Sequence, residues 1–214
     1  MDILNQLKNI DLYLLDQIMK GRLNASSRIL DAGCGEGRNC HFLIDQGCSV
    51  LGIDPLPEAI ATLQEVYPHL SEEFIVCAIE DYKTEENFDF IICNAVLHFA
   101  ESHHQFQCMM AALANLLTET GVLFIRMTSD FATSMAFVSD ENGRADLPDG
   151  TNRYLMTKSE LVKAMNENKL HFVEPLKTIN VDDQRCMSTL VLSKEAKVAL
   201  DIGWLDLSQN PMMR

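Results

Sequence analysis

The stretch RILDAGCGEGRN, residues 28–39, decides how this chain folds. It begins as a short apolar strand that ends at Asp31, and glycines follow at alternate positions: Gly33, Gly35 and Gly37. Glycine adopts positive φ readily and has no side chain, so this turn lets a ligand approach the backbone. A strand, a glycine turn and a helix start place free backbone N–H groups at the carboxyl edge of a sheet. We therefore expect a nucleotide-like ligand at this turn.

Beyond this turn, apolar strands alternate with amphipathic helices. Further strands are predicted over residues 49–53, 74–77, 88–93 and 121–127. Such alternation predicts a parallel sheet with helices on both faces, and the nearly continuous apolar strands agree with burial on both sides. Two last strands, 170–181 and 185–193, are joined by a short polar turn and predict an antiparallel hairpin at the end of that sheet.

Two regions lie outside this alternation. Residues 1–24 predict an N-terminal helical cap, with one apolar stripe made of Ile3, Leu7, Ile10, Leu14 and Ile18. The cap either packs on the domain or covers the mouth of the glycine turn, with Tyr13 or Arg22 against the ligand. Residues 25–214 are expected to form a single domain, in which the long loop 128–156 has no clear period. Loops of that length tend to be lids or binding loops.

Composition narrows the function. The chain has 214 residues, with 31 acidic residues against 17 Lys and Arg and a net charge of −14. This charge argues against a nucleic-acid partner, because such affinity depends on Lys and Arg neutralising phosphates. No stretch is apolar enough to span a membrane, and the start does not resemble a signal peptide. Seven single cysteines without a C-x-x-C pair indicate reduced thiols in a cytoplasmic protein and no metal site.

The glycine turn departs from the dinucleotide pattern G-x-G-x-x-G. Arg38 stands where the third glycine belongs, and Glu36 places an anion where a pyrophosphate would sit. No Gly-Lys-Ser/Thr follows, so a Walker loop is excluded. Asp54, after the second strand, is placed to accept from both hydroxyls of a ribose; otherwise it only starts a turn. A nucleoside without phosphates fits best.

At this point the motifs resemble a known family. D-A-G-C-G-E-G from residue 31, G-I-D from residue 52 and F-D-F-I-I-C-N-A-V-L-H-F from residue 88 are similar to the class I S-adenosylmethionine-dependent methyltransferases. The resemblance covers roughly residues 25 to 195. It implies an α/β, Rossmann-like three-layer sandwich whose mostly parallel sheet has seven strands, the last one antiparallel.

The resemblance also implies which residues bind S-adenosylmethionine and its product S-adenosylhomocysteine. The methionine part would contact the glycine turn, and the ribose would bind to Asp54. The adenine would lie beside Pro55, and the transferred methyl group would lie near Asn94. Ala78 stands where the family often has an adenine-binding acid, which leaves that role to the Ile79 backbone or to Glu80. The implied cofactor-binding residues are Asp31, Ala32, Gly33, Cys34, Gly35, Asn39, Asp54, Pro55, Ile79, Glu80, Asn94 and Val96.

Methyl transfer mainly needs two aligned reactants. A base that removes a proton from the acceptor is needed only for some acceptors. His98 is the candidate catalytic base; the alternative is a histidine that lines the site without proton transfer. Arg126, Arg144 and Arg153 either bind an acidic acceptor or form surface ion pairs.

The expected function is methylation of a small molecule. Enzymes that methylate nucleic-acid adenine or glutamine amides have two prolines and an aromatic residue after the fourth strand. This sequence has none of these residues directly after Asn94, where Ala95-Val96-Leu97 follow. Two alternatives remain: a regulator that binds S-adenosylmethionine without turnover, and a nicotinamide-dependent oxidoreductase. The acceptor, its reacting atom and the oligomeric state stay unassigned.

Overall fold

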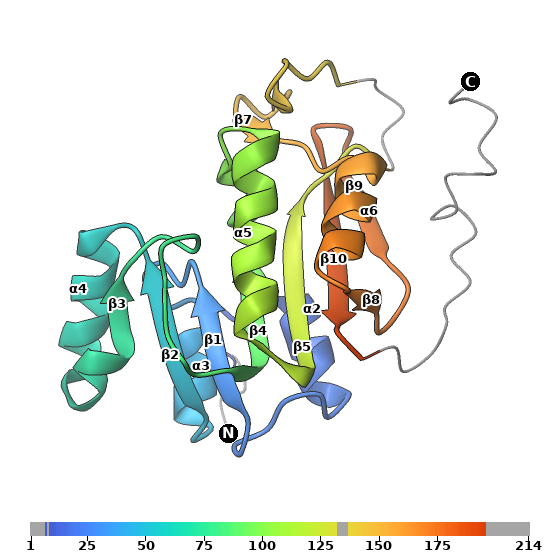
Figure 1. Cartoon of the computed structure of the whole chain (residues 1–214). Helices are drawn as coiled ribbons and strands as arrows, with labels where there is room; N and C mark the ends of the chain where they lie inside the picture. The colour runs from blue at the N-terminus through green and yellow to red at the C-terminus, as the bar shows by residue number, and fades with distance from the viewer. Residues whose placement is uncertain (1–6, 8, 132–136, 196–214) are drawn as a thin grey trace.

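A twisted sheet forms the centre of the molecule in the computed structural model, which describes residues 7, 9–131 and 137–195 (Figure 1). Eight strands join in the order β3-β2-β1-β4-β5-β10-β8, and β9 pairs with β10 beside β8. The strands are β1 Arg28–Ala32, β2 Ser49–Asp54, β3 Phe74–Val76, β4 Phe88–Asn94, β5 Leu117–Thr128, β8 His171–Phe172, β9 Lys177–Val181 and β10 Arg185–Ser193. The first five are parallel, and β10 is antiparallel to its neighbours.

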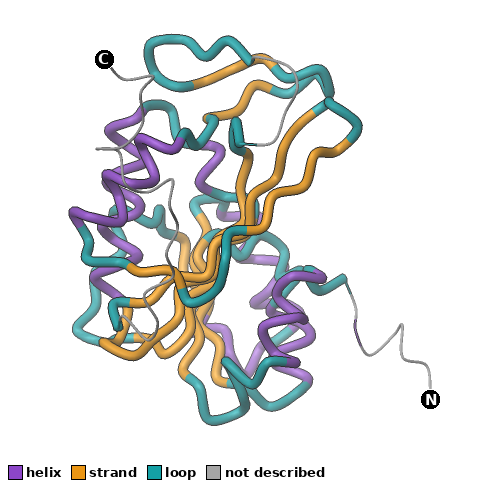
Figure 2. Tube along the Cα trace, turned by 90° about the vertical axis from the view of Figure 1, so that its right-hand side faces the viewer, coloured by secondary structure: helices purple, strands orange, loops and turns teal. Residues whose placement is uncertain are grey.

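Helices cover both faces of the sheet, as Figure 2 shows from the side. Among the described residues, the α-helices given bounds are α2 Leu12–Met19, α3 Cys40–Asp45, α4 Pro57–Val66, α5 His103–Leu116 and α6 Lys158–Glu167, and the 3-10 helices are η1 Pro68–Glu73 and η2 Leu97–Phe99. In Figure 1, α5 and α6 lie in front of the sheet and α2 and α3 behind it. The predicted three-layer α/β sandwich is confirmed.

Strand residues alternate between two buried cores, because successive side chains of a strand point to opposite faces. In β1, Ile29 belongs to the same core as Leu43 of α3 and Ile60 of α4, whereas Leu30 belongs to the core that contains Phe106 of α5 and Leu161 of α6. Both faces are therefore buried, which explains the nearly continuous apolar strands.

The predicted strand over 170–181 is wrong in one respect: it is two strands, β8 and β9. Pro175 lies in the gap between them. Proline has no N–H to donate to the ladder, so the pairing with β10 breaks there. The sheet therefore has eight strands instead of the seven expected, because β8 and β9 take the place of one predicted strand beside β10. The turn to β10 was predicted correctly, and Asp182 and Asp183 both have the positive φ of tight hairpin turns.

The long loop also holds structure that its sequence did not indicate. β6 Arg144–Asp146 and β7 Asn152–Tyr154 form a small antiparallel hairpin around the turn at Pro148. Met156 then bridges back to Ser129, beside the end of β5. The loop therefore contributes an ordered flap next to the carboxyl ends of the strands, and its predicted role as a lid stays a prediction.

The described part of the predicted N-terminal cap contains the helix α2. α2 begins only after Asp11, whose carboxylate accepts from the N–H groups of Tyr13 and Leu14 and so caps the helix. Leu14 of the predicted stripe is buried, while Ile3 lies outside the described residues. The division into a cap and one domain stays a prediction.

Candidate functional site

The glycine turn connects β1 to α3 and is fixed by the neighbouring strand β2. The N–H groups of Gly33 and Cys34 donate to the carbonyl of Ile53 at 2.8 and 3.0 Å. Gly33 has a φ of 82°, and a Cβ added there would overlap the side chain of Val96. A residue with a side chain would therefore be both strained and obstructed at this position.

Asp54 ties the end of β2 to the turn. One carboxylate oxygen accepts from the Gly35 N–H and the other from the Leu56 N–H, both at 2.9 Å. A carboxylate oxygen has two lone pairs, so each retains the capacity to accept from a ligand hydroxyl. The neighbouring apolar surface is exposed at Pro55, at Leu56 and, across the strand pair, at Val76.

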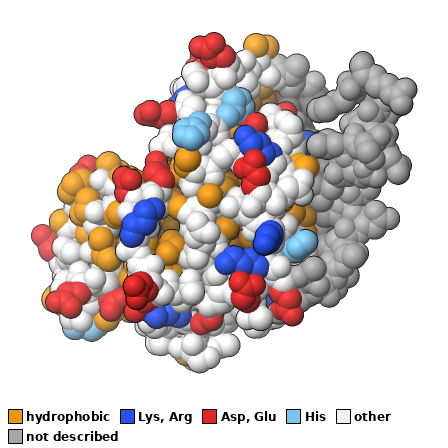
Figure 3. Space-filling model, viewed as in Figure 1, with side chains coloured by type: hydrophobic (Ala, Val, Ile, Leu, Met, Phe, Trp, Pro, Cys, Tyr) orange, Lys and Arg blue, Asp and Glu red, His pale blue; other side chains and the backbone are white. Residues whose placement is uncertain are grey.

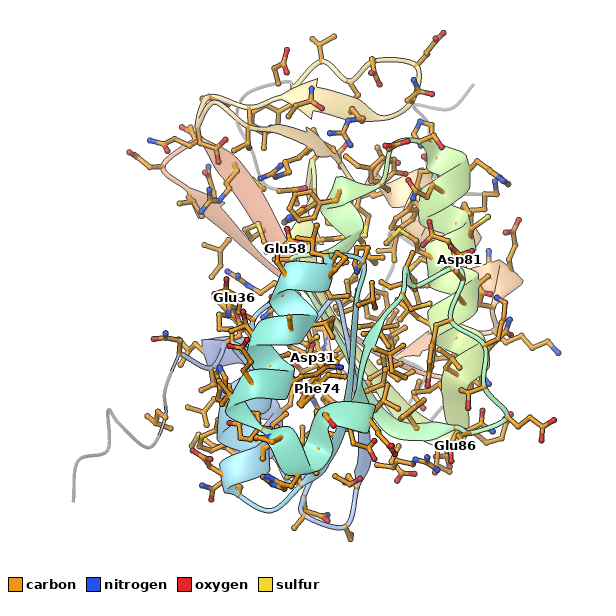
Figure 4. All side chains as sticks on the ribbon, turned by 90° about the vertical axis from the view of Figure 1, so that its left-hand side faces the viewer. Asp31, Glu36, Glu58, Phe74, Asp81 and Glu86 are labelled. Carbon is orange, nitrogen blue, oxygen red and sulfur yellow. The ribbon has the colours of Figure 1, made fainter. Side chains whose placement is uncertain are left out.

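Asp31 is the buried acid beneath the turn, and Figure 4 shows it behind α4, with Glu36 nearer the upper edge. The Cys40 thiol donates to its carboxylate at 3.3 Å. Burial, above all, raises the pKa of Asp31 to about 7, and the nearby Asp54 adds to the rise. A cationic group bound close by would favour its ionised form.

The loop after β3 places its two predicted residues differently. Ile79 is buried in the core on the α5 side of the sheet. Glu80 accepts from the Gln105 side-chain amide of α5 at 2.7 Å, so its carboxylate is held by the helix. Its predicted contact with adenine stays a prediction.

Three side chains at or just after the carboxyl ends of β4 and β5 have polar atoms that are buried and without a partner among the described residues. They are both amide atoms of Asn94, Nδ1 of His98 and Nε of Arg126. Asn94 ends β4 and lies opposite Arg126 of β5 in the strand register, and His98 follows in η2. Buried polar atoms normally have partners, so this concentration points to a ligand.

Burial above all, together with the positive charges of Arg153, Arg185 and Arg126, lowers the pKa of His98 to about 4. The imidazole is therefore neutral near pH 7. It can accept or donate a hydrogen bond there, but it is a weak base.

Asp11 joins the two parts of the site, and we did not predict it. Its carboxylate bonds to Arg38 of the glycine turn at 3.0 Å and to Arg126 at 3.5 Å. Its own N–H donates to the side chain of Asn39 at 3.1 Å. The signal in the sequence was its helix-capping position, but nothing there revealed the arginines. Of the two predicted cap residues, Tyr13 lies against the Arg126 guanidinium, whereas Arg22 pairs with Glu174.

A cavity of about 260 Å³ opens beside these residues. Its walls come from the glycine turn, the ends of β4 and β5, the β6–β7 flap and the β9–β10 hairpin: Arg38, Ala95, His98, Arg126, Thr128, Asp149, Thr151, Arg153, Val181, Arg185 and Met187. Arg144, the third predicted acceptor-binding arginine, does not line it. Arg144 instead donates to the carbonyls of Phe99 and Ala100.

Within the described part of the chain, no three His, Cys, Asp or Glu side chains are grouped as a metal site would require. None of the described helices has the length and apolar character to cross a bilayer.

The sequence comparisons agree with this geometry. Residues 29–121 match the model of a methyltransferase domain. The ubiquinone biosynthesis O-methyltransferase of Rhodopseudomonas palustris (strain TIE-1) is 30% identical over 155 residues, which are 69% of this chain and 59% of that protein. The chain therefore spans less than two thirds of the length of this relative.

Solved structures show the same fold. A S-adenosylmethionine-dependent methyltransferase from Clostridium acetobutylicum ATCC 824 has a TM-score of 0.64 at 14% identity, over 85% of this chain and 89% of that one. The 1,6-didemethyltoxoflavin-N1-methyltransferase of Burkholderia thailandensis, with bound 1,6-didemethyltoxoflavin and S-adenosylhomocysteine, has a TM-score of 0.61 at 17% identity, over 84% and 74%. With the domain match and the fold in agreement, the chain belongs to the class I S-adenosylmethionine-dependent methyltransferase family.

Proposed function

We propose that this chain is an S-adenosylmethionine-dependent methyltransferase that acts on a small molecule. One observation carries the proposal: the Asp54 carboxylate is fixed against the glycine turn, 2.9 Å from the Gly35 nitrogen. On the other side of β1, at the end of β4, lies the amide of Asn94, which is buried and has no hydrogen-bond partner among the described residues. This edge of the sheet thus offers acceptors for hydroxyl groups and a free amide, in the arrangement that its family uses for the cofactor.

The residues at this edge fit a cofactor without phosphates. Glu36 places a negative charge in the turn, and the Arg38 side chain is paired with Asp11. Asp54 would hold the ribose hydroxyls, and Asp31 with the turn from Ala32 to Gly35 would hold the methionine part. Pro55 and Ile79 would adjoin the adenine, and Asn94 with Val96 the methyl end. Asn39 would act indirectly, by holding Asp11 beside the turn.

When bound, S-adenosylmethionine supplies a methyl group on a sulfonium, which is transferred in line to a nucleophile. The chain contributes alignment, which can be worth ~7–11 kcal/mol, and a cavity at the end of β4 for the acceptor. His98 lines that cavity, and its Nδ1 has no partner in the part of the chain that the structure describes. A base whose pKa is about 4 suits an acceptor group that is itself acidic or needs only orientation, so we propose His98 as a hydrogen-bonding partner of the acceptor.

We further propose a cytoplasmic enzyme with no nucleic-acid or membrane partner. The support is the net charge of −14 and the small size of the cavity, about 260 Å³. Two other functions remain as outcomes of the test: a regulator that binds the cofactor without turnover, and a nicotinamide-dependent oxidoreductase.

Isothermal titration calorimetry with S-adenosylhomocysteine and with NAD tests the cofactor assignment. We expect S-adenosylhomocysteine to bind and Asp54→Ala to weaken it by roughly 1.5–3 kcal/mol, the worth of hydrogen bonds to a charged group. Asp89→Ala is the matched control, because Asp89 also accepts a backbone N–H, from Arg28, at the opposite edge of the sheet. Binding of NAD alone would overturn the assignment. Tight cofactor binding without turnover of any acceptor would favour the regulator.

A further inference from the structure

The cavity beside Asn94 is far more basic than the rest of this acidic chain. Four arginines line it: Arg38, Arg126, Arg153 and Arg185. Elsewhere, as on the face in Figure 3, acidic and basic side chains are interspersed, and the chain as a whole has a net charge of −14. We propose that the cavity recognises an oxyanion on the methyl acceptor, so that the acceptor is a small organic acid. The inference rests on the proposed methyltransferase function.

The described carboxylates do not neutralise these arginines fully. Asp11 serves both Arg38 and Arg126, and Asp149 pairs with Arg185 at 2.7 Å. Arg153 has no ion pair with any described residue, and its guanidinium lies over the Phe99 ring, 4.6 Å from the centroid. Four cations thus face two carboxylates, and a bound anion would offset the excess positive charge.

The cavity also presents hydrogen-bonding atoms that have no partner. Nε of Arg126 and Nδ1 of His98 are both buried and unpaired among the described residues. A guanidinium presents its N–H groups in a planar fork that matches the oxygens of a carboxylate or phosphate. An acid in the cavity would therefore satisfy the free Arg126 donor and meet Arg153 as well.

Position and size agree with an acceptor rather than a second cofactor. Ala95, which lines the cavity, directly follows Asn94 and has a φ of 64°. Non-glycine residues adopt such φ values rarely, and they cluster at functional sites. The volume of about 260 Å³ is below the roughly 300–1,000 Å³ of most ligand pockets, which favours a compact acid.

Ligand-observed NMR titrations with benzoate, phenyl phosphate and the neutral benzamide test the proposal, with and without S-adenosylhomocysteine. We expect benzoate or phenyl phosphate to bind at least about tenfold more tightly than benzamide, the order of one hydrogen bond to a charged group. The stronger of the two anions identifies the acid as a carboxylate or a phosphate. We expect Arg153→Gln to remove most of this preference.

Arg28→Gln is the matched control, since it removes the same charge at the opposite edge, where Arg28 pairs with Glu86; Figure 4 shows Glu86 at that lower edge. Equal binding of benzamide and the anions would overturn the proposal, as would an anion preference that survives both Arg153→Gln and Arg126→Gln. The titration without S-adenosylhomocysteine keeps this outcome separate from the methyltransferase assignment. If the cofactor product fails to bind but the arginine-dependent anion preference persists, only the assignment fails.

Discussion

The glycine turn takes its form from two adjacent strands, whereas the cavity draws its walls from segments between residues 38 and 187. The turn is held mainly by hydrogen bonds from backbone groups. The N–H groups of Gly33 and Cys34 donate to the Ile53 carbonyl, and the Gly35 N–H donates to the Asp54 carboxylate. In the cavity, long side chains converge from β5, β7 and β10. The turn is therefore specified by local backbone conformation, and the cavity by charge brought together through the fold.

The turn is where a single small substitution should have the largest effect. Gly33→Ala combines a positive φ with an overlap against Val96, so we expect it to lower the free energy of unfolding by about 2–5 kcal/mol. Gly47→Ala is the matched control, because Gly47 also has positive φ but open space around it, and should cost only about 1–2 kcal/mol. Urea unfolding followed by circular dichroism measures both.

A second variant separates the overlap from the strain of the backbone. Adding Val96→Ala to Gly33→Ala removes the methyl groups that a new Cβ would meet. The double variant should therefore recover stability relative to Gly33→Ala alone. If Gly33→Ala costs no more than Gly47→Ala, close packing at the turn is not what requires glycine there.

This contrast also explains what could be predicted from the sequence. The first strand and its glycines lie within residues 28–39, and Asp54 ends the next strand, so local patterns were enough to predict the fold and the position of the turn. The cofactor-binding roles of these residues stay predictions. Arg126 and Arg153 were predicted as acid-binding candidates, together with Arg144, which bonds to backbone carbonyls instead. Nothing in the sequence separated these three, because only the β6–β7 flap and the strand register decide which arginines face the cavity.

Two omissions have the same origin. Asp11 and Arg185 lie far apart in the chain, and neither belongs to a motif. In the sequence, Asp11 resembles any helix-capping residue, and Arg185 resembles any residue at the start of a hairpin strand. Their partners, Arg126 and Asp149, come from elements that meet them only in the folded chain. Long-range ion pairs of this kind leave no local signal.

The pH dependence of stability tests the environment of the buried His98 in the cavity. Its folded-state pKa of about 4 lies below the usual 6.5, so the unfolded chain binds a proton more readily than the native one between these values. Its contribution to stability is thus complete above pH 6.5 and is lost as the pH falls toward 4. Asp31 has a raised pKa and acts in the opposite direction, so the difference between variants is the quantity to measure.

We expect His98→Gln to lose less stability than the wild type when the pH is lowered from about 6.5 to about 4. Thermal unfolding across this range, with His104→Gln as the control on the exposed start of α5, measures the difference. Parallel profiles of the wild type and His98→Gln would show that the arginines and burial do not act on this histidine as described.

The smallest expected effect concerns Asp11, which links the two halves. Asp11→Asn should keep the cap of α2, because Asn caps helices as well as Asp, while removing a negative charge from beside Arg38 and Arg126. We expect benzoate to bind roughly fivefold more tightly, about 1 kcal/mol, which is the order of one charge near a solvated site. Asp16→Asn makes the same charge change on α2, where Asp16 pairs with Lys20 and Lys177, and should leave benzoate binding unchanged. A similar gain from both variants would mean that net charge, and not the carboxylate shared by the turn and the cavity, sets the anion affinity.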